Sequence, residues 1–103
     1  MNLRDWLAHR EPSPPRVLRE RVEALALAVP EREGDPAGTL LDAAAAALAG
    51  LATRPAEDRA TALDLLAVDA LVTYALEWTA EAPDDLPGLS ERAMSRLSRV
   101  AVR

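Results

Sequence analysis

Residues 55–82, PAEDRATALDLLAVDALVTYALEWTAEA, form the longest and most regular segment of the chain. This segment runs for roughly 28 residues with no glycine and no proline after its first position, which predicts a helix of about 40 Å at 1.5 Å per residue. At about 100° per residue, its apolar side chains fall into two stripes on nearly opposite faces. We therefore expect a helix over 55–82 that needs a neighbour on each of two sides.

The two stripes differ in charge. The first is uncharged and carries the aromatic residues of the segment: Leu63, Ala67, Ala70, Leu71, Tyr74 and Trp78. The second has a carboxylate, Asp69, among Ala62, Leu65, Val72 and Leu76. Because an unpaired carboxylate is costly to bury, three interpretations of Asp69 stay open. It reaches water at the edge of a partly covered stripe, it pairs with an arginine across an interface, or it acts as a general acid in a pocket.

Two helices are expected near the N-terminus. The first, over 2–10, is too short to be stable alone, so Trp6 must dock on the rest of the fold, either as a cover on the bundle end or facing a ligand. The second, over 14–29, follows a proline-rich break with Ser13 as its expected N-cap, since proline suits the first helical turn. Its core side chains recur at helical spacing: Leu18, Val22, Leu25 and Val29.

A proline- and glycine-rich loop then leads to a helix over 38–52, which we expect to begin near Asp35 or Thr39. From Ala43 to Ala52 no residue is charged, which is typical of a buried helix. Its connection to the long segment is short, so the two helices should pack as an antiparallel hairpin.

These patterns predict an all-α fold. We expect a single domain over 1–103 that forms an antiparallel bundle of four main helices, with the short N-terminal helix docked on it. Strands are not expected, because alanine and leucine favour helix and no segment alternates apolar and polar residues. The main helices are placed at 14–29, 38–52, 55–82 and 88–102.

Composition narrows the classes of function. Without cysteine the chain has no disulfides and no cysteine-bound zinc. A formal net charge of −5 argues against unspecific binding of nucleic acid. No apolar run is long enough to cross a membrane and the N-terminus does not resemble a signal peptide, so we expect a soluble cytoplasmic protein without a membrane contact. No nucleophile motif or glycine-rich phosphate loop occurs, so we expect neither catalysis nor a cofactor.

Charge is distributed unevenly along the chain. Residues 55–85 carry eight acids and one arginine, whereas residues 86–103 carry four arginines and one glutamate. These arginines recur at helical spacing and form one basic face. Such a face suits acidic groups of the same fold or of a dimer partner, an acidic protein, or nucleic-acid phosphates. The face comprises Arg92, Arg96, Arg99 and Arg103.

We therefore expect a small protein-interaction or oligomerisation module, in the simplest case a homodimer. The candidate interface residues are Leu65, Asp69, Val72, Leu76, Tyr74, Trp78 and Trp6. One alternative is a helical bundle that binds a metal or a small cationic ligand through Asp69, Glu77 and Glu81, although the sole histidine, His9, lies outside any Glu-x-x-His pair. The other is a regulatory protein that contacts nucleic acid through the basic face.

Overall fold

The structure, a computed structural model, describes residues 3–81, 91, 94–95 and 97–98. Within residues 3–81 the helices are α1 (Leu3–Ala8), α2 (Arg16–Leu27), α3 (Pro36–Leu51) and α4 (Arg59–Ala80). The expected all-helical class is confirmed, because these helices pack together and the described part contains no strand. The short N-terminal helix is present as well. No helix of the described part is long and apolar enough to cross a membrane.

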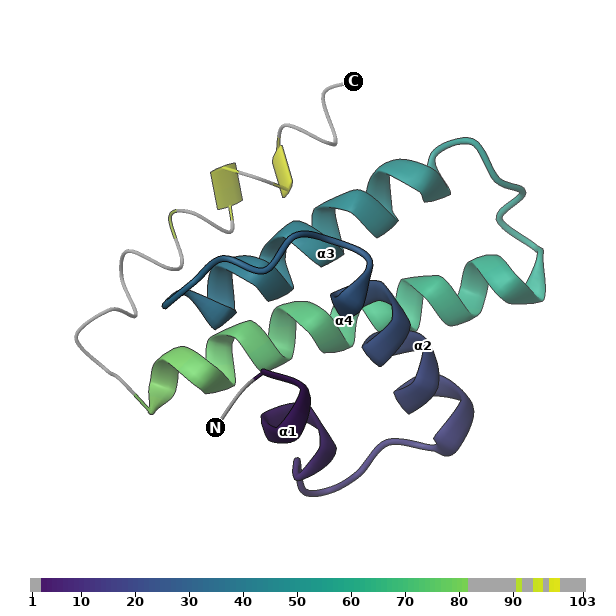
Figure 1. The fold of residues 1–103 in the computed structure, drawn as a ribbon. Coiled ribbons are helices and arrows are strands. Elements are labelled where there is room, and N and C mark those ends of the chain that lie inside the picture. Colours follow the sequence, from purple (N-terminus) through teal and green to yellow (C-terminus); the bar gives the residue numbers. More distant parts are fainter. Residues whose placement is uncertain (1–2, 82–90, 92–93, 96, 99–103) are drawn as a thin grey trace.

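Helices α3 and α4 lie side by side and run in opposite directions, as expected for the hairpin (Figure 1). α2 crosses α4 and also contacts α3, and α1 lies against the far end of α4. The antiparallel arrangement is thus seen for α3 and α4. The fourth main helix expected, over 88–102, falls largely outside the described residues.

The core lies where α3 meets α4. Leu40, Ala44, Leu71 and Ala75 are each 0% exposed. Alanine at these positions lets the two backbones approach closely, and the leucines fill the space that remains. α3 therefore supplies the centre of the core, but its burial is concentrated in its first half. Within the uncharged stretch Ala43–Ala52, which was predicted to be buried, only Ala43, Ala44 and Leu51 are buried, because the opposite side of this half of the helix has no described neighbour.

The start of α3 is fixed by the Asp35 side chain. Its carboxylate accepts a hydrogen bond from the backbone N–H of Gly38 at 3.0 Å, and Pro36 follows at a position that needs no donor. A side chain at position 38 would collide with the Asp35 carboxylate, so the capping carboxylate keeps this position only beside a glycine. Thr39, the other expected start, is buried instead, and its hydroxyl accepts from the backbone N–H of Arg32 at 2.8 Å.

The long helix starts later than expected. Asp58 is the N-cap of α4, and its carboxylate accepts from the backbone N–H of Ala60 at 3.2 Å. An aspartate is a strong N-cap because it satisfies a donor that the first helical turn leaves free. Residues 55–58 therefore form a turn before α4.

The N-cap predicted for α2 was wrong. Pro15 takes that position without a side-chain hydrogen bond, and the Ser13 hydroxyl accepts from the Arg19 guanidinium at 3.2 Å. The predicted core stripe of α2 does face inward. Val22 is 2% exposed, and the other members are partly buried against the core: Leu18, Leu25 and Val29.

Candidate interaction face and ligand pocket

One side of α4 is covered by no other described helix. We call it the outer face, and it consists of Ala62, Leu65, Leu66, Asp69, Val72, Thr73, Leu76 and Ala80. Leu65 is 49% exposed, Leu66 57% and Leu76 39%, while Val72 is partly buried. The second stripe predicted from the sequence thus lies on the outer face. Its expected neighbour is not among the described helices.

Asp69 lies exposed in the middle of the outer face, as in the first interpretation given to it. The buried carboxylate of α4 is a different one, Asp64, whose side chain is only 7% exposed. Asp64 faces inward because it follows the buried side of the helix, three residues before Ala67 and seven before Leu71. That spacing was the signal in the sequence that could have identified it.

Two arginines from other parts of the fold neutralise Asp64. Arg21 of α2 donates to both carboxylate oxygens, from Nε at 2.5 Å and Nη2 at 3.0 Å. Arg54, in the turn before α4, donates from Nη1 at 2.6 Å. The hydrogen bonds from Arg21, together with the one from Arg54 and both positive charges, hold the pKa of Asp64 below its usual value despite burial. This cluster ties α2 and the α3–α4 turn to α4.

Three candidate interface residues of the sequence form an aromatic cluster within the chain. The Trp6 ring meets Trp78 edge-on at 4.9 Å and Tyr74 at 6.2 Å between centroids. Trp6 is 7% exposed, so its predicted docking is confirmed. Burial, aided by the nearby charge of Glu77, raises the pKa of Tyr74, while Arg10 acts in the opposite direction. The cluster fixes α1 on the C-terminal end of α4.

Arg10 reinforces the same contact. Its guanidinium lies 4.0 Å above the Trp6 ring, 3.5 Å from the Glu77 carboxylate and 3.3 Å from that of Glu81. The two carboxylates considered as metal ligands thus face a cation. Within the described residues, no three side chains of the kinds that bind metals come together.

The basic face lies outside the described residues. Arg92, Arg96, Arg99 and Arg103 all belong to that part of the chain. Of the neighbouring positions, Met94 is helical and 72% exposed.

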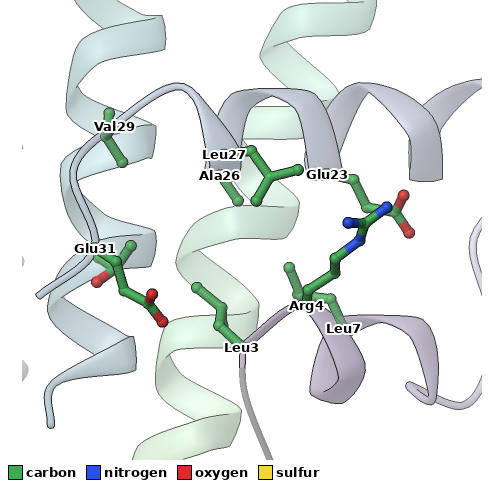
Figure 2. Close-up of a pocket in the computed structure, with 9 residues that line it drawn as sticks. Leu3, Arg4, Leu7, Glu23, Ala26, Leu27, Val29 and Glu31 are labelled. Carbon is green, nitrogen blue, oxygen red and sulfur yellow. The ribbon is translucent and has the colours of Figure 1, made fainter. Parts of the chain in front are cut away.

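A pocket of about 360 Å³ opens between α1, the second half of α2 and the loop that follows it (Figure 2). Its apolar lining comes from Leu3, Leu7, Ala26, Leu27 and Val29. Thr39 contributes to the lining, and three charged residues complete it: Arg4, Glu23 and Glu31. The sequence did not predict this pocket, because its walls come from four segments, α1, α2, the following loop and the start of α3, whose packing no local pattern reveals.

Known proteins provide no further guide to these sites. No family model, no curated protein and no solved structure matches this chain. The function must therefore be argued from the outer face, the Asp64 cluster and the pocket themselves.

Proposed function

We propose that this chain is a small protein-interaction module that forms a homodimer through the outer face of α4 and has no catalytic activity of its own. The observation that supports this proposal is the exposure of three leucines on one face of one helix: Leu65, Leu66 and Leu76. Burying apolar surface in an interface stabilises the complex by about 25 cal/mol per Å² of surface removed from water. Contiguous exposed apolar surface is typical of interaction sites.

The spacing of these residues favours a second copy as the partner. A two-fold axis between residues 70 and 71 would place α4 antiparallel to its copy, so that Leu65 of one chain meets Leu76 of the other twice. In this pairing Asp69 meets Val72. The same residues thus serve both sides of the interface, which is the condition for a closed dimer.

Asp69 limits the affinity of this dimer. It is the only charged residue of the outer face, and bringing it near an apolar surface removes part of its hydration. We therefore propose a reversible dimer that exchanges with monomer at micromolar concentration. Replacing Asp69 by leucine should strengthen it.

The other two functions receive less support. Arg10 occupies the space between Glu77 and Glu81 that a metal or small cation would need. A nucleic-acid contact rests on the basic face, none of whose arginines is described. We further propose that the protein is cytoplasmic. We also propose that segment 88–102 forms the fourth main helix of an antiparallel bundle.

The mass in solution tests the proposal. Light scattering behind a sizing column, at two salt concentrations, should give a mass that rises with protein concentration from 11.1 kDa towards twice that value. Val72→Glu and Leu76→Glu should hold the chain at the monomer mass, and Asp69→Leu should shift it towards dimer. Val17→Glu is the matched control, because Val17 of α2 is 64% exposed and lies outside the outer face.

Two results would contradict a dimer of this kind. One is a wild-type mass that stays monomeric over the whole concentration range. The other is dissociation by Val17→Glu to the same extent as by Val72→Glu, which would place the interface elsewhere.

A further inference from the structure

We propose that the pocket beneath α1 binds a small amphipathic cation, an alkyl or aryl ammonium ion. Its apolar body would lie among the leucines of the pocket and its ammonium group at Glu31. This site is separate from the outer face of α4 and does not depend on dimer formation. Three properties of the pocket support it: its size, its apolar interior and the charges at its opening.

Size and lining favour a small ligand with an apolar body. A volume of about 360 Å³ lies at the lower end of the usual range for small-molecule pockets. Leu3 and Leu7 form one wall, and Ala26 and Val29 contribute opposite it (Figure 2). The apolar body of a ligand that binds here is therefore surrounded by aliphatic side chains.

The interior offers no free hydrogen-bonding side chain. Thr39 is the one uncharged polar residue of the lining, and it is 1% exposed. Its hydroxyl already accepts from the Arg32 backbone N–H and donates to the Asp35 carbonyl at 3.3 Å. A polar group placed deep in the pocket would lose its hydration without a new partner, so the polar part of the ligand must lie at the opening.

The charged residues of the lining are one arginine and two glutamates, so the opening of the pocket carries a net negative charge. Arg4 and Glu23 point towards one another on one side of the pocket (Figure 2). Glu31 lies on the other side, across Leu3. Its neighbour in the chain, Arg32, is engaged by Asp42, with Nε at 2.5 Å and Nη2 at 3.2 Å.

The described part of the chain contains no ion pair that uses Glu31. A ligand that carries a positive charge beside its apolar body therefore complements the pocket. A negatively charged ligand of the same shape would meet an uncompensated carboxylate instead.

Three probes with the same chain length separate the contribution of apolar contacts to the binding affinity from the contribution of charge. Octylammonium, octanol and octanoate are titrated into the full chain at pH 7, below the concentrations at which they self-associate. Binding is followed through the methyl NMR signals of the pocket leucines. We expect octylammonium to bind about 2- to 5-fold more tightly than octanol, a factor typical of an exposed charge pair. Octanoate should bind most weakly.

Variants at the opening assign the charge preference to one residue. Glu31→Gln should remove the advantage of octylammonium over octanol while octanol binding persists. Glu33→Gln is the matched control, since Glu33 is exposed in the same loop and is not part of the lining. It should leave the order of the three probes unchanged.

Variants in the interior test the apolar part. Ala26→Leu should fill the pocket and weaken all three probes by 10-fold or more. Leu27→Ser, at a wall position that is 63% exposed, should also weaken all three probes. Val17→Ser is its control, because Val17 is 64% exposed on the same helix and is not part of the lining. The proposal is overturned if octanoate binds as tightly as octylammonium or if no probe binds at millimolar concentration. Equal effects of Glu31→Gln and Glu33→Gln would also overturn it.

Discussion

The two faces of α4 are both predominantly uncharged, yet one is buried and the other is exposed. The inner face presents small residues around a single leucine, with Ala67, Leu71 and Ala75 each 0% exposed. The outer face presents the bulkier Leu65, Leu66 and Leu76. The smaller side chains are buried because the alanine-rich α3 approaches closely, and only a smooth surface fits against it. Close packing, rather than the size of the apolar side chains, decides which face joins the core.

Each face also carries one aspartate, and the two aspartates differ in burial in the same way as the two faces. Asp64 is buried between two arginines, whereas Asp69 stands in water. The two are five residues apart on one helix, which at about 100° per residue puts their side chains on different sides of it, so position on the helix and not residue type explains the difference in burial. Asp64 is charged inside the fold only because Arg21 and Arg54 reach it from elsewhere in the chain.

The largest contrast is expected from truncating a leucine on each face. Leu71→Ala should lower the free energy of unfolding by about 2–5 kcal/mol, because it leaves a cavity in the core. Leu65→Ala should change it by less than about 0.5 kcal/mol. Urea unfolding in dilute solution, where a dimer does not contribute, measures both. Equal losses for the two variants would show that the outer face is covered.

Neutralising each aspartate sharpens the comparison of charges. Asp64→Asn should cost about 1–3 kcal/mol, because Arg21 and Arg54 then lose their charged acceptor in a partly buried place. Asp69→Asn should leave the free energy of unfolding within about 0.5 kcal/mol of the wild type. The same urea experiment decides, and a costly Asp69→Asn would refute the exposed position of that side chain.

Low pH should remove the contribution that ionised Asp64 makes to the free energy of unfolding. Since the arginines lower its pKa in the folded state, the unfolded chain takes up the proton first as pH falls. The stabilisation is therefore complete above the unfolded value of about 3.9 and is lost as pH falls through the lower folded value. The difference in unfolding free energy between wild type and Asp64→Asn should be constant above pH 5 and shrink below pH 4. A difference that grows towards low pH would contradict the paired arrangement.

The smallest effect concerns one threonine on each face. Thr61 is 3% exposed, and its hydroxyl has no hydrogen-bond partner among the described residues. Thr61→Val keeps the shape and removes the unsatisfied group, so stability should rise by up to about 1 kcal/mol. Thr73→Val, on the exposed outer face, is the control and should have no measurable effect. Thermal unfolding resolves the two, and a loss of stability in Thr61→Val would reveal a partner for that hydroxyl.

Local patterns were sufficient to predict the helices. Hydrophobic spacing and turn residues placed four of the five predicted helices where α1 to α4 lie, and the need for Trp6 to dock followed from the shortness of its helix. The caps were less certain because several candidates stood side by side. Asp35 and Asp58 make the observed cap hydrogen bonds, whereas Ser13 hydrogen-bonds to Arg19 instead.

The candidate sites were less predictable because they depend on contacts between distant segments. The outer face was visible as a second stripe, although nothing in the sequence showed that it would lack a neighbour. The Asp64 cluster was missed because Arg21 lies 43 residues away in the chain. Asp69 was the predicted candidate instead, because it interrupts an apolar stripe of the sequence, whereas Asp64 lies beside such a stripe. The pocket requires α1, α2, the following loop and the start of α3 to be in place at once.

During synthesis, α1 can dock only after α4 has been made. Its six residues are too few to hold a helix alone, and its aromatic anchor packs on Trp78, near the end of α4. Arg10, just after α1, closes the contact with Glu81, 71 positions later. Of the helices α1 to α4, the first to be synthesised is thus the last that can dock, and the pocket to which α1 contributes a wall forms only when the rest of the described fold has been made.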